Sequence, residues 1–212
     1  IGVFDSGVGG LSVAKAIEAA LPDASVVFVN DLAHMPYGSK PPQEVLGYVV
    51  PILEDLVNQG CQVIVIACNT VTTTLITELR AQFSVPLIGI EPMVKVAALK
   101  SESKVIAVCA TPTTLASSRY QWLKQQYASD LTVLEPDCSD WSAMIEQDQV
   151  DHQRIKQQIL DLCDSKVDVI VLACTHYHWI EEHIQTAAAG RAIVIQPEQA
   201  VIAQLKKIIK TL

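Results

Sequence analysis

Two cysteines stand at matching places in two similar stretches of this sequence. Cys68 ends the segment Val-Ile-Val-Ile-Ala-Cys, and Cys174, 106 residues later, ends the segment Val-Ile-Val-Leu-Ala-Cys. Each is followed by two polar residues, Asn69 and Thr70 after the first and Thr175 and His176 after the second. A single cysteine at the end of a strand would indicate a buried structural thiol. Two thiols in equivalent settings with polar neighbours instead indicate a reactive pair.

A pair of opposed thiols suits a reaction that takes a proton from one face of a carbon and returns one to the other face. A thiolate is a competent base, with an unperturbed pKa of about 8.5 that neighbouring groups can lower. The opposite thiol is the acid, and the roles exchange with the handedness of the substrate. This two-base chemistry is what a racemase needs. Cys61, Cys109 and Cys163 lack such a setting, and we assign them to the core.

Apolar runs rich in Val and Ile recur along the chain and predict the strands that must position these thiols. The expected strands are residues 1–4, 25–29, 63–67, 85–90, 105–110, 131–134, 167–173 and 192–195. Longer segments with helical periodicity lie between most of them, such as residues 42–59 and 152–164. Continuous apolar strands that alternate with helices indicate a parallel sheet covered on both faces.

The two halves of the chain resemble each other beyond the cysteines. Ile90-Glu91-Pro92 returns 105 residues later as Ile195-Gln196-Pro197, and the strand before Asp5 corresponds to the strand before Thr111. We therefore expect an α/β protein of two pseudo-symmetric α/β domains with mainly parallel sheets. The first domain would hold residues 1–92 plus 198–212, and the second residues 93–197. Ligands bind at the carboxyl ends of parallel strands, so we expect the active site in the cleft between the domains.

Composition limits the possible partners. Half of the 212 residues are apolar and the net charge is −8, so nucleic-acid binding is not expected. Lys206, Lys207 and Lys210 fit the solvated face of a terminal helix. No apolar run reaches the roughly 18 residues of a membrane span. Six cysteines without a C-x-x-C pair indicate a reducing cytoplasm, and because the sequence starts at Ile1 inside an expected strand, we expect a few residues to precede it.

Five blocks resemble the glutamate racemase family and occur in that family's order over nearly the whole chain. They are Asp5-Ser6-Gly7-Val8-Gly9-Gly10, Pro36-Tyr37-Gly38, Ala67-Cys68-Asn69-Thr70, Gly89-Ile90-Glu91-Pro92 and Cys174-Thr175-His176-Tyr177. The resemblance implies an isomerase that interconverts L- and D-glutamate with no cofactor, neither pyridoxal phosphate nor metal. It also implies that the product feeds peptidoglycan synthesis for the bacterial cell wall, and that the chain forms a homodimer.

The resemblance also implies roles for individual residues. Cys68 and Cys174 would be the proton-transfer pair, with Asp5 assisting Cys68 and His176 assisting Cys174. Glu146 falls where the family has a further acidic group near the histidine. The implied substrate-binding residues are Ser6, Pro36, Tyr37, Gly38, Asn69, Thr70, Thr111, Thr114 and Thr175. Hydroxyls, an amide and backbone N–H groups can hold the carboxylates of glutamate without an arginine.

Several alternatives remain open. Asp5 could be a simple helix cap, and His176 could be a merely hydrogen-bonded histidine. The family pattern is not followed at His178 and Trp179, nor in residues 137–141. Cys174, His176 and His178 alternate at period two, so on an extended segment they could bind zinc. A two-lobed amino-acid binding protein would need the cleft but not both thiols. A related racemase acting on aspartate or another acidic amino acid is the nearest enzyme alternative.

Overall fold

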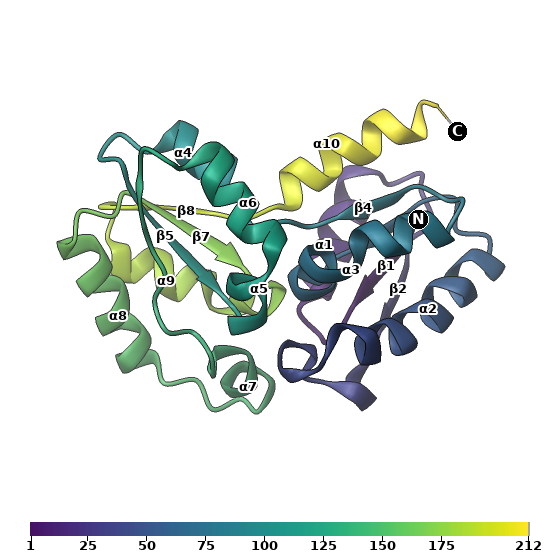
Figure 1. The fold of residues 1–212 in the computed structure, drawn as a ribbon, viewed down its shortest axis with the longest axis horizontal. Coiled ribbons are helices and arrows are strands. Elements are labelled where there is room, and N and C mark those ends of the chain that lie inside the picture. Colours follow the sequence, from purple (N-terminus) through teal and green to yellow (C-terminus); the bar gives the residue numbers. More distant parts are fainter. Residues whose placement is uncertain (212) are drawn as a thin grey trace. The chain divides into compact units, whose positions relative to one another are not determined.

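A computed structural model describes residues 1–211 of the chain (Figure 1). The chain divides into two compact units, Ile1–Glu91 with Pro197–Leu212, and Pro92–Gln196. Each unit is a parallel sheet with helices on both faces, which confirms the expected α/β fold class. Every expected strand forms, with bounds that differ from the expected ones by two residues at most. The units are described one at a time.

The sheet of the first unit is built from Val- and Ile-rich segments and holds four strands within the described residues. Its order is β2 (Val27–Asn30), β1 (Gly2–Asp5), β3 (Ile64–Ile66) and β4 (Leu87–Gly89), and neighbouring strands are parallel. The two central strands, β1 and β3, are fully buried because helices cover both of their faces. Phe4 pairs with Ile66 in the register, so the residues that follow these two strands emerge side by side.

Two pairs of helices cover this sheet, and each presents an apolar stripe to it. Val13 and Ile17 of α1 (Gly10–Ala20) and Val201 and Leu205 of α10 (Glu198–Ile209) belong to the core on one face. The other face carries α2 (Pro42–Asn58) and α3 (Asn69–Gln82). Two short 3-10 turns, η1 (Leu32–His34) and η2 (Tyr37–Ser39), lie between β2 and α2. The last helix of the chain therefore completes the core of the first unit.

The sheet of the second unit repeats the topology of the first. Its order is β6 (Thr132–Leu134), β5 (Val105–Ala110), β7 (Val169–Ala173) and β8 (Ile193–Ile195), again with parallel neighbours. In both sheets the second strand in sequence lies at one edge beside the first, followed by the third and fourth. Ala110 of β5 pairs with Ala173 of β7, so Thr111 and Cys174 leave the sheet from adjacent positions.

Helices again cover both faces of this second sheet. In Figure 1, α4 (Val94–Lys100) and α6 (Ser118–Tyr127) lie on one side of it, and α8 (His152–Asp164) and α9 (Glu181–Ala188) on the other. Side-chain caps begin two of these helices: Ser117 accepts from the Tyr120 N–H and Asp151 from the Arg154 N–H. Three short helices follow strand ends or lie in connections: α5 (Pro112–Ala116), α7 (Trp141–Glu146) and η3 (Thr175–Ile180).

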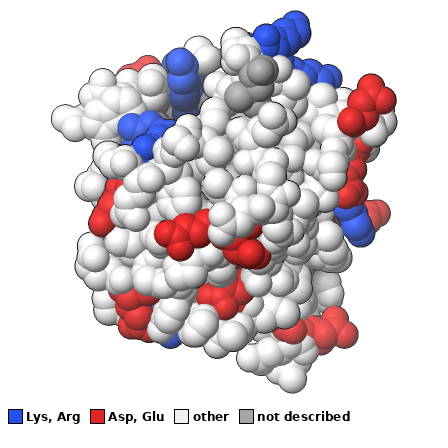
Figure 2. All heavy atoms as spheres, turned by 90° about the vertical axis from the view of Figure 1, so that its right-hand side faces the viewer, with Lys and Arg blue, Asp and Glu red and all other residues white. Residues whose placement is uncertain are grey.

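Surface charge is dispersed on the face that Figure 2 shows. Most Lys and Arg on that face lie toward the top of the view, and Asp and Glu are scattered over its middle, its right side and its lower part. Lys206 and Lys207 are exposed on α10, as expected of a solvated helix face. Among the helices of residues 1–211, none combines the length and the apolar character needed to cross a membrane.

Candidate active site

Cys68 lies where β3 passes into α3. It is the N-cap residue of that 14-residue helix and is only 5% exposed. The Ser6 hydroxyl, which follows the neighbouring strand β1, lies 3.4 Å from the Cys68 sulfur. The positive end of the α3 dipole favours an anion at this place. The parallel register thus brings a thiol and a hydroxyl together beside a helix terminus that suits a thiolate.

Asp5 is the last residue of β1 and is fully buried. Its Oδ2 accepts a hydrogen bond of 2.7 Å from the Gly10 backbone N–H at the start of α1. The helix approaches so closely that a Cβ on Gly10 would lie 2.5 Å from the Asp5 Cβ. Asp5 therefore caps α1 through one oxygen and belongs to the same strand end as Ser6.

The turn formed by Pro36, Tyr37 and Gly38 follows a cis peptide bond between Met35 and Pro36. Pro36 is exposed, Gly38 is half-buried and Tyr37 is buried in the same apolar cluster as Cys68. The Tyr37 hydroxyl donates to Asp31 Oδ2 at 2.6 Å. Burial and this bond hold the pKa of Tyr37 well above its ordinary value, so the phenol remains a donor.

Asp31 was not predicted from the sequence, although it anchors this turn. It follows β2, and its backbone N–H donates to the Asp5 carbonyl at 3.3 Å. Its carboxylate also contacts His34 Nδ1 at 2.8 Å. Its place directly after a strand, at the same sheet edge as Asp5, is the signal that could have identified it.

Asn69 and Thr70 form the first turn of α3, directly after Cys68, and both are buried. The Asn69 side chain is 3% exposed, yet neither its Oδ1 nor its Nδ2 has a hydrogen-bond partner among the described residues. Leaving a buried amide unsatisfied costs about 1–3 kcal/mol, and such groups are rare in folded proteins. A polar ligand at this position would satisfy the amide.

Cys174, His176 and Glu146 come together in the second unit. Cys174 is 8% exposed at the carboxyl end of β7, and its sulfur lies 3.7 Å from His176 Nδ1. The other ring nitrogen, Nε2, contacts Glu146 Oε1 at the end of α7. An imidazole held between a thiol and a carboxylate can exchange a proton with the sulfur. The Ser142 hydroxyl, which sequence reasoning missed, lies 3.5 Å from the same sulfur.

The three threonines expected in the second half of the site lie at the same sheet edge. Thr111 directly follows β5 and caps α5, accepting from the Thr114 N–H at 3.3 Å and donating to the Thr114 hydroxyl at 3.0 Å. Thr114 and Thr175 are buried, and Thr175 directly follows Cys174. The structure therefore places Thr111, Thr175 and Cys174 at the ends of two paired strands.

The zinc alternative for Cys174, His176 and His178 required an extended segment. Residues Thr175–Ile180 instead form the 3-10 helix η3, so residues two apart point in different directions. Within residues 1–211, no group of three or more His, Cys, Asp or Glu side chains is arranged to hold a metal ion. All six cysteines are buried free thiols, and the burial of Cys61, Cys109 and Cys163 agrees with their expected place in the core.

Comparison with known proteins identifies what the chain resembles. The model of the Asp/Glu/Hydantoin racemase family matches residues 1–205. The glutamate racemase of Ralstonia nicotianae is 38% identical over 209 residues, which cover 97% of this chain and 76% of that protein. The glutamate racemase of Methylococcus capsulatus is 35% identical over 211 residues, covering 98% of this chain and 78% of that protein.

Solved structures of glutamate racemases share the fold of this chain. A glutamate racemase isoform from Bacillus anthracis has a TM-score of 0.86 and 29% identity, covering 99% of this chain and 81% of that one. The Escherichia coli glutamate racemase, solved with L-glutamate and the activator UDP-MurNAc-Ala, has a TM-score of 0.90 and 26% identity, with coverage of 99% and 82%.

Proposed function

Because this chain belongs to the Asp/Glu/Hydantoin racemase family, we propose that it is a glutamate racemase that interconverts L- and D-glutamate by two-base proton transfer. One observation carries the proposal. Each unit holds a nearly buried thiol at the carboxyl end of a central strand, Cys68 in the first and Cys174 in the second, beside groups that can exchange protons.

The relatives that resemble this chain in sequence as well as in fold support glutamate, rather than aspartate, as its substrate. The curated glutamate racemases are 31% to 38% identical to this chain over nearly its full length. The aspartate racemase of Picrophilus torridus has a TM-score of 0.60 but is only 20% identical, so it supports the fold alone.

The proposed reaction breaks and re-forms one C–H bond. For one enantiomer, the Cys68 thiolate takes the α-proton, and the Cys174 thiol delivers its proton to the opposite face of the resulting carbanion. For the other enantiomer the two thiols exchange roles. Asp5 assists Cys68, while the Glu146 carboxylate orients His176, which exchanges a proton with Cys174. No step requires pyridoxal phosphate or a metal.

Substrate binding in this proposal uses neutral donors. The unsatisfied Asn69 amide would hold one polar group of glutamate, with further donors from hydroxyls at the strand ends. The remaining proposed substrate-binding residues are Ser6, Pro36, Tyr37, Gly38, Thr70, Thr111, Thr114 and Thr175. The buried Tyr37 and Asp31 pair keeps the 36–38 turn in place.

We further propose a cytoplasmic homodimer whose D-glutamate serves peptidoglycan synthesis. The six free thiols support a reducing compartment. The dimer and the cell-wall role are supported by resemblance to the glutamate racemase family. Analytical ultracentrifugation would test the dimer.

A circular-dichroism assay of the purified chain with L-glutamate, D-glutamate and L-aspartate tests the activity, after dialysis against a chelator. We expect both glutamate enantiomers to approach a racemic mixture, while aspartate reacts far more slowly. Cys68→Ala and Cys174→Ala should each abolish racemisation, because each removes one of the two proton-transfer groups. Cys61→Ala, a buried thiol away from the site, is the matched control. A Cys174→Ala protein that racemises at a near-native rate would exclude the two-base mechanism.

A further inference from the structure

In the second unit, Ser142 brings a hydroxyl from a distant segment to the proposed proton-transfer sulfur of Cys174. Its Oγ lies 3.5 Å from Cys174 Sγ, and either atom can be the donor. We propose that Ser142 is a positioning residue that holds the Cys174 sulfur and stabilises it both as thiol and as thiolate. This inference rests on the proposed function, in which Cys174 acts in both states.

Helix α7 fixes the place of this hydroxyl. Ser142 and Glu146 are four residues apart on α7, so they share one face of the helix. Glu146 contacts His176 while Ser142 contacts Cys174, so one helix face supplies both partners of the thiol and imidazole pair. Fully buried Trp141 anchors the start of α7, with its ring against that of Tyr177 at a centroid distance of 5.1 Å.

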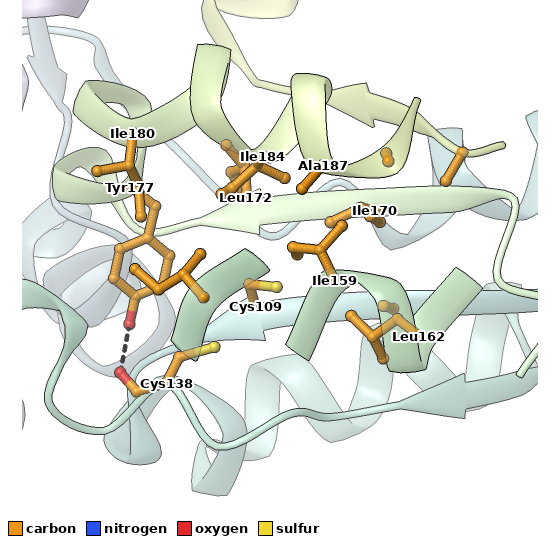
Figure 3. Packing of buried hydrophobic residues seen from close by; sticks show 14 of the residues in the cluster. Cys109, Cys138, Ile159, Leu162, Ile170, Leu172, Tyr177, Ile180, Ile184 and Ala187 are labelled. Atoms are coloured by element: carbon orange, nitrogen blue, oxygen red, sulfur yellow. Dashed lines mark hydrogen bonds between the residues drawn. The ribbon is translucent and has the colours of Figure 1, made fainter. Parts of the chain in front are cut away.

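Tyr177 gives the Ser142 hydroxyl a second partner. The Tyr177 phenol donates to the Cys138 carbonyl at 2.9 Å, as the dashed line in Figure 3 shows. Burial raises the pKa of Tyr177 well above its ordinary value, so the phenol keeps this proton. The Ser142 side chain acts on this phenol in the opposite sense and lowers its pKa, as a hydroxyl that donates to the phenol oxygen would. Since the phenol's own proton is directed to Cys138, its oxygen is available to accept from Ser142.

This arrangement lets one hydroxyl serve both protonation states of the sulfur. When Cys174 is a thiol, its S–H donates to Ser142 Oγ, and the Ser142 proton points to the Tyr177 oxygen. When Cys174 is a thiolate, rotation about the Cβ–Oγ bond turns the Ser142 proton to the sulfur. Hydrogen bonds to a charged acceptor are about twice as strong as neutral ones, so the hydroxyl favours the thiolate.

In the first unit a serine hydroxyl also contacts the proton-transfer thiol, but a different kind of element supplies it. Ser6 lies 3.4 Å from Cys68, but it follows the adjacent strand β1. The residue 106 positions after Ser6 is Pro112, which has no hydroxyl. The internal repeat therefore does not supply a hydroxyl to Cys174, and α7 supplies it instead.

A matched pair of variants tests the inference without depending on racemisation. Ser142→Thr keeps the hydroxyl, whereas Ser142→Val introduces a side chain with nearly the shape of threonine but without a hydroxyl. As a control, Ser165→Ala removes an exposed serine of the same unit. Alkylation of Cys174 by iodoacetamide is followed against pH by mass spectrometry of its peptide in the full chain. We expect Ser142→Val to slow alkylation near neutral pH by about tenfold relative to Ser142→Thr, and to move the pH midpoint upward. The Cys68 peptide should react at an unchanged rate in every variant.

Equal pH midpoints for Ser142→Thr and Ser142→Val would overturn the inference. Exchange of the glutamate α-hydrogen in deuterated water is measured on the parent chain in parallel. If the parent chain exchanges the α-hydrogen but the two variants have equal midpoints, only the role of Ser142 is refuted and the proposed function stands. Absence of parent exchange refutes the proposed function, and with it the catalytic meaning of Ser142, even if the midpoint moves.

Discussion

Replacing Gly10 with alanine tests how strictly the start of α1 is fitted to Asp5. The added Cβ would lie 2.5 Å from the Asp5 Cβ and 3.1 Å from Phe28 Cε2. Carbon atoms pack at about 3.5–4.0 Å, so α1 must move by roughly 1 Å. Overpacking of this kind costs about 1–3 kcal/mol, and loosening the bond from Gly10 N–H to Asp5 adds about 1.5–3 kcal/mol. Because such costs overlap, we expect a net loss of about 2–4 kcal/mol.

The control is Gly47→Ala, where the added Cβ meets nothing within 4 Å. Gly47 is exposed inside α2, so alanine there should stabilise the protein by about 0.5–1 kcal/mol. Thermal unfolding followed by far-ultraviolet circular dichroism should show a midpoint lower by on the order of 10 °C for Gly10→Ala. All three tryptophans, Trp122, Trp141 and Trp179, lie in the second unit, so their fluorescence reports that unit separately. A Gly10→Ala midpoint equal to or above that of the parent would refute the argument.

Two further predictions concern the helpers and acid stability. Asp5→Asn keeps an acceptor for the Gly10 N–H but loses the base, so α-hydrogen exchange in deuterated water should slow by about a hundredfold from the enantiomer that Cys68 deprotonates. His176→Asn should instead slow exchange mainly from the enantiomer that Cys174 deprotonates. If each variant slows exchange equally from both enantiomers, the helpers are not paired with individual thiols. Partial burial alone would raise the pKa of Asp168, but hydrogen bonds from the Ser103 backbone N–H and its neighbours outweigh it and lower the pKa. This carboxylate therefore stabilises the fold above about pH 4 and loses that effect as the pH falls through its lowered pKa. Urea unfolding should show Asp168→Asn to be less stable than the parent by about 1 kcal/mol at pH 7 and equal to it near pH 2; a difference that persists at pH 2 would contradict the assignment.

The strands and the two thiols could be predicted because they depend on local pattern. The run of residues 63–67 is apolar throughout, which indicates a parallel strand buried on both faces and places Cys68 at its carboxyl end. The duplication then places Cys174 by the same reasoning. Glu146 was identified from family resemblance alone, because nothing in its own spacing indicates that it contacts His176.

Other features of the site depend on tertiary packing that spacing does not reveal. Ser142 meets Cys174 because Trp141 packs on Tyr177, and that contact joins segments more than thirty residues apart. The alternation of Cys174, His176 and His178 was misleading because Thr175–Ile180 is helical. Side chains two residues apart point in the same direction only on an extended backbone.

The return of α10 to the first unit has a consequence for synthesis on the ribosome. The core face formed by α1 and strands β1 and β3 includes Val201 and Leu205, which leave the ribosome more than 100 residues after Glu91. The second unit, Pro92–Gln196, is continuous and is fully made before those residues emerge. The second unit can therefore finish folding first, while the apolar face of the first unit stays uncovered until α10 is made. A nascent chain stalled shortly after Gln196 should accordingly be a substrate for chaperones that bind exposed apolar surface.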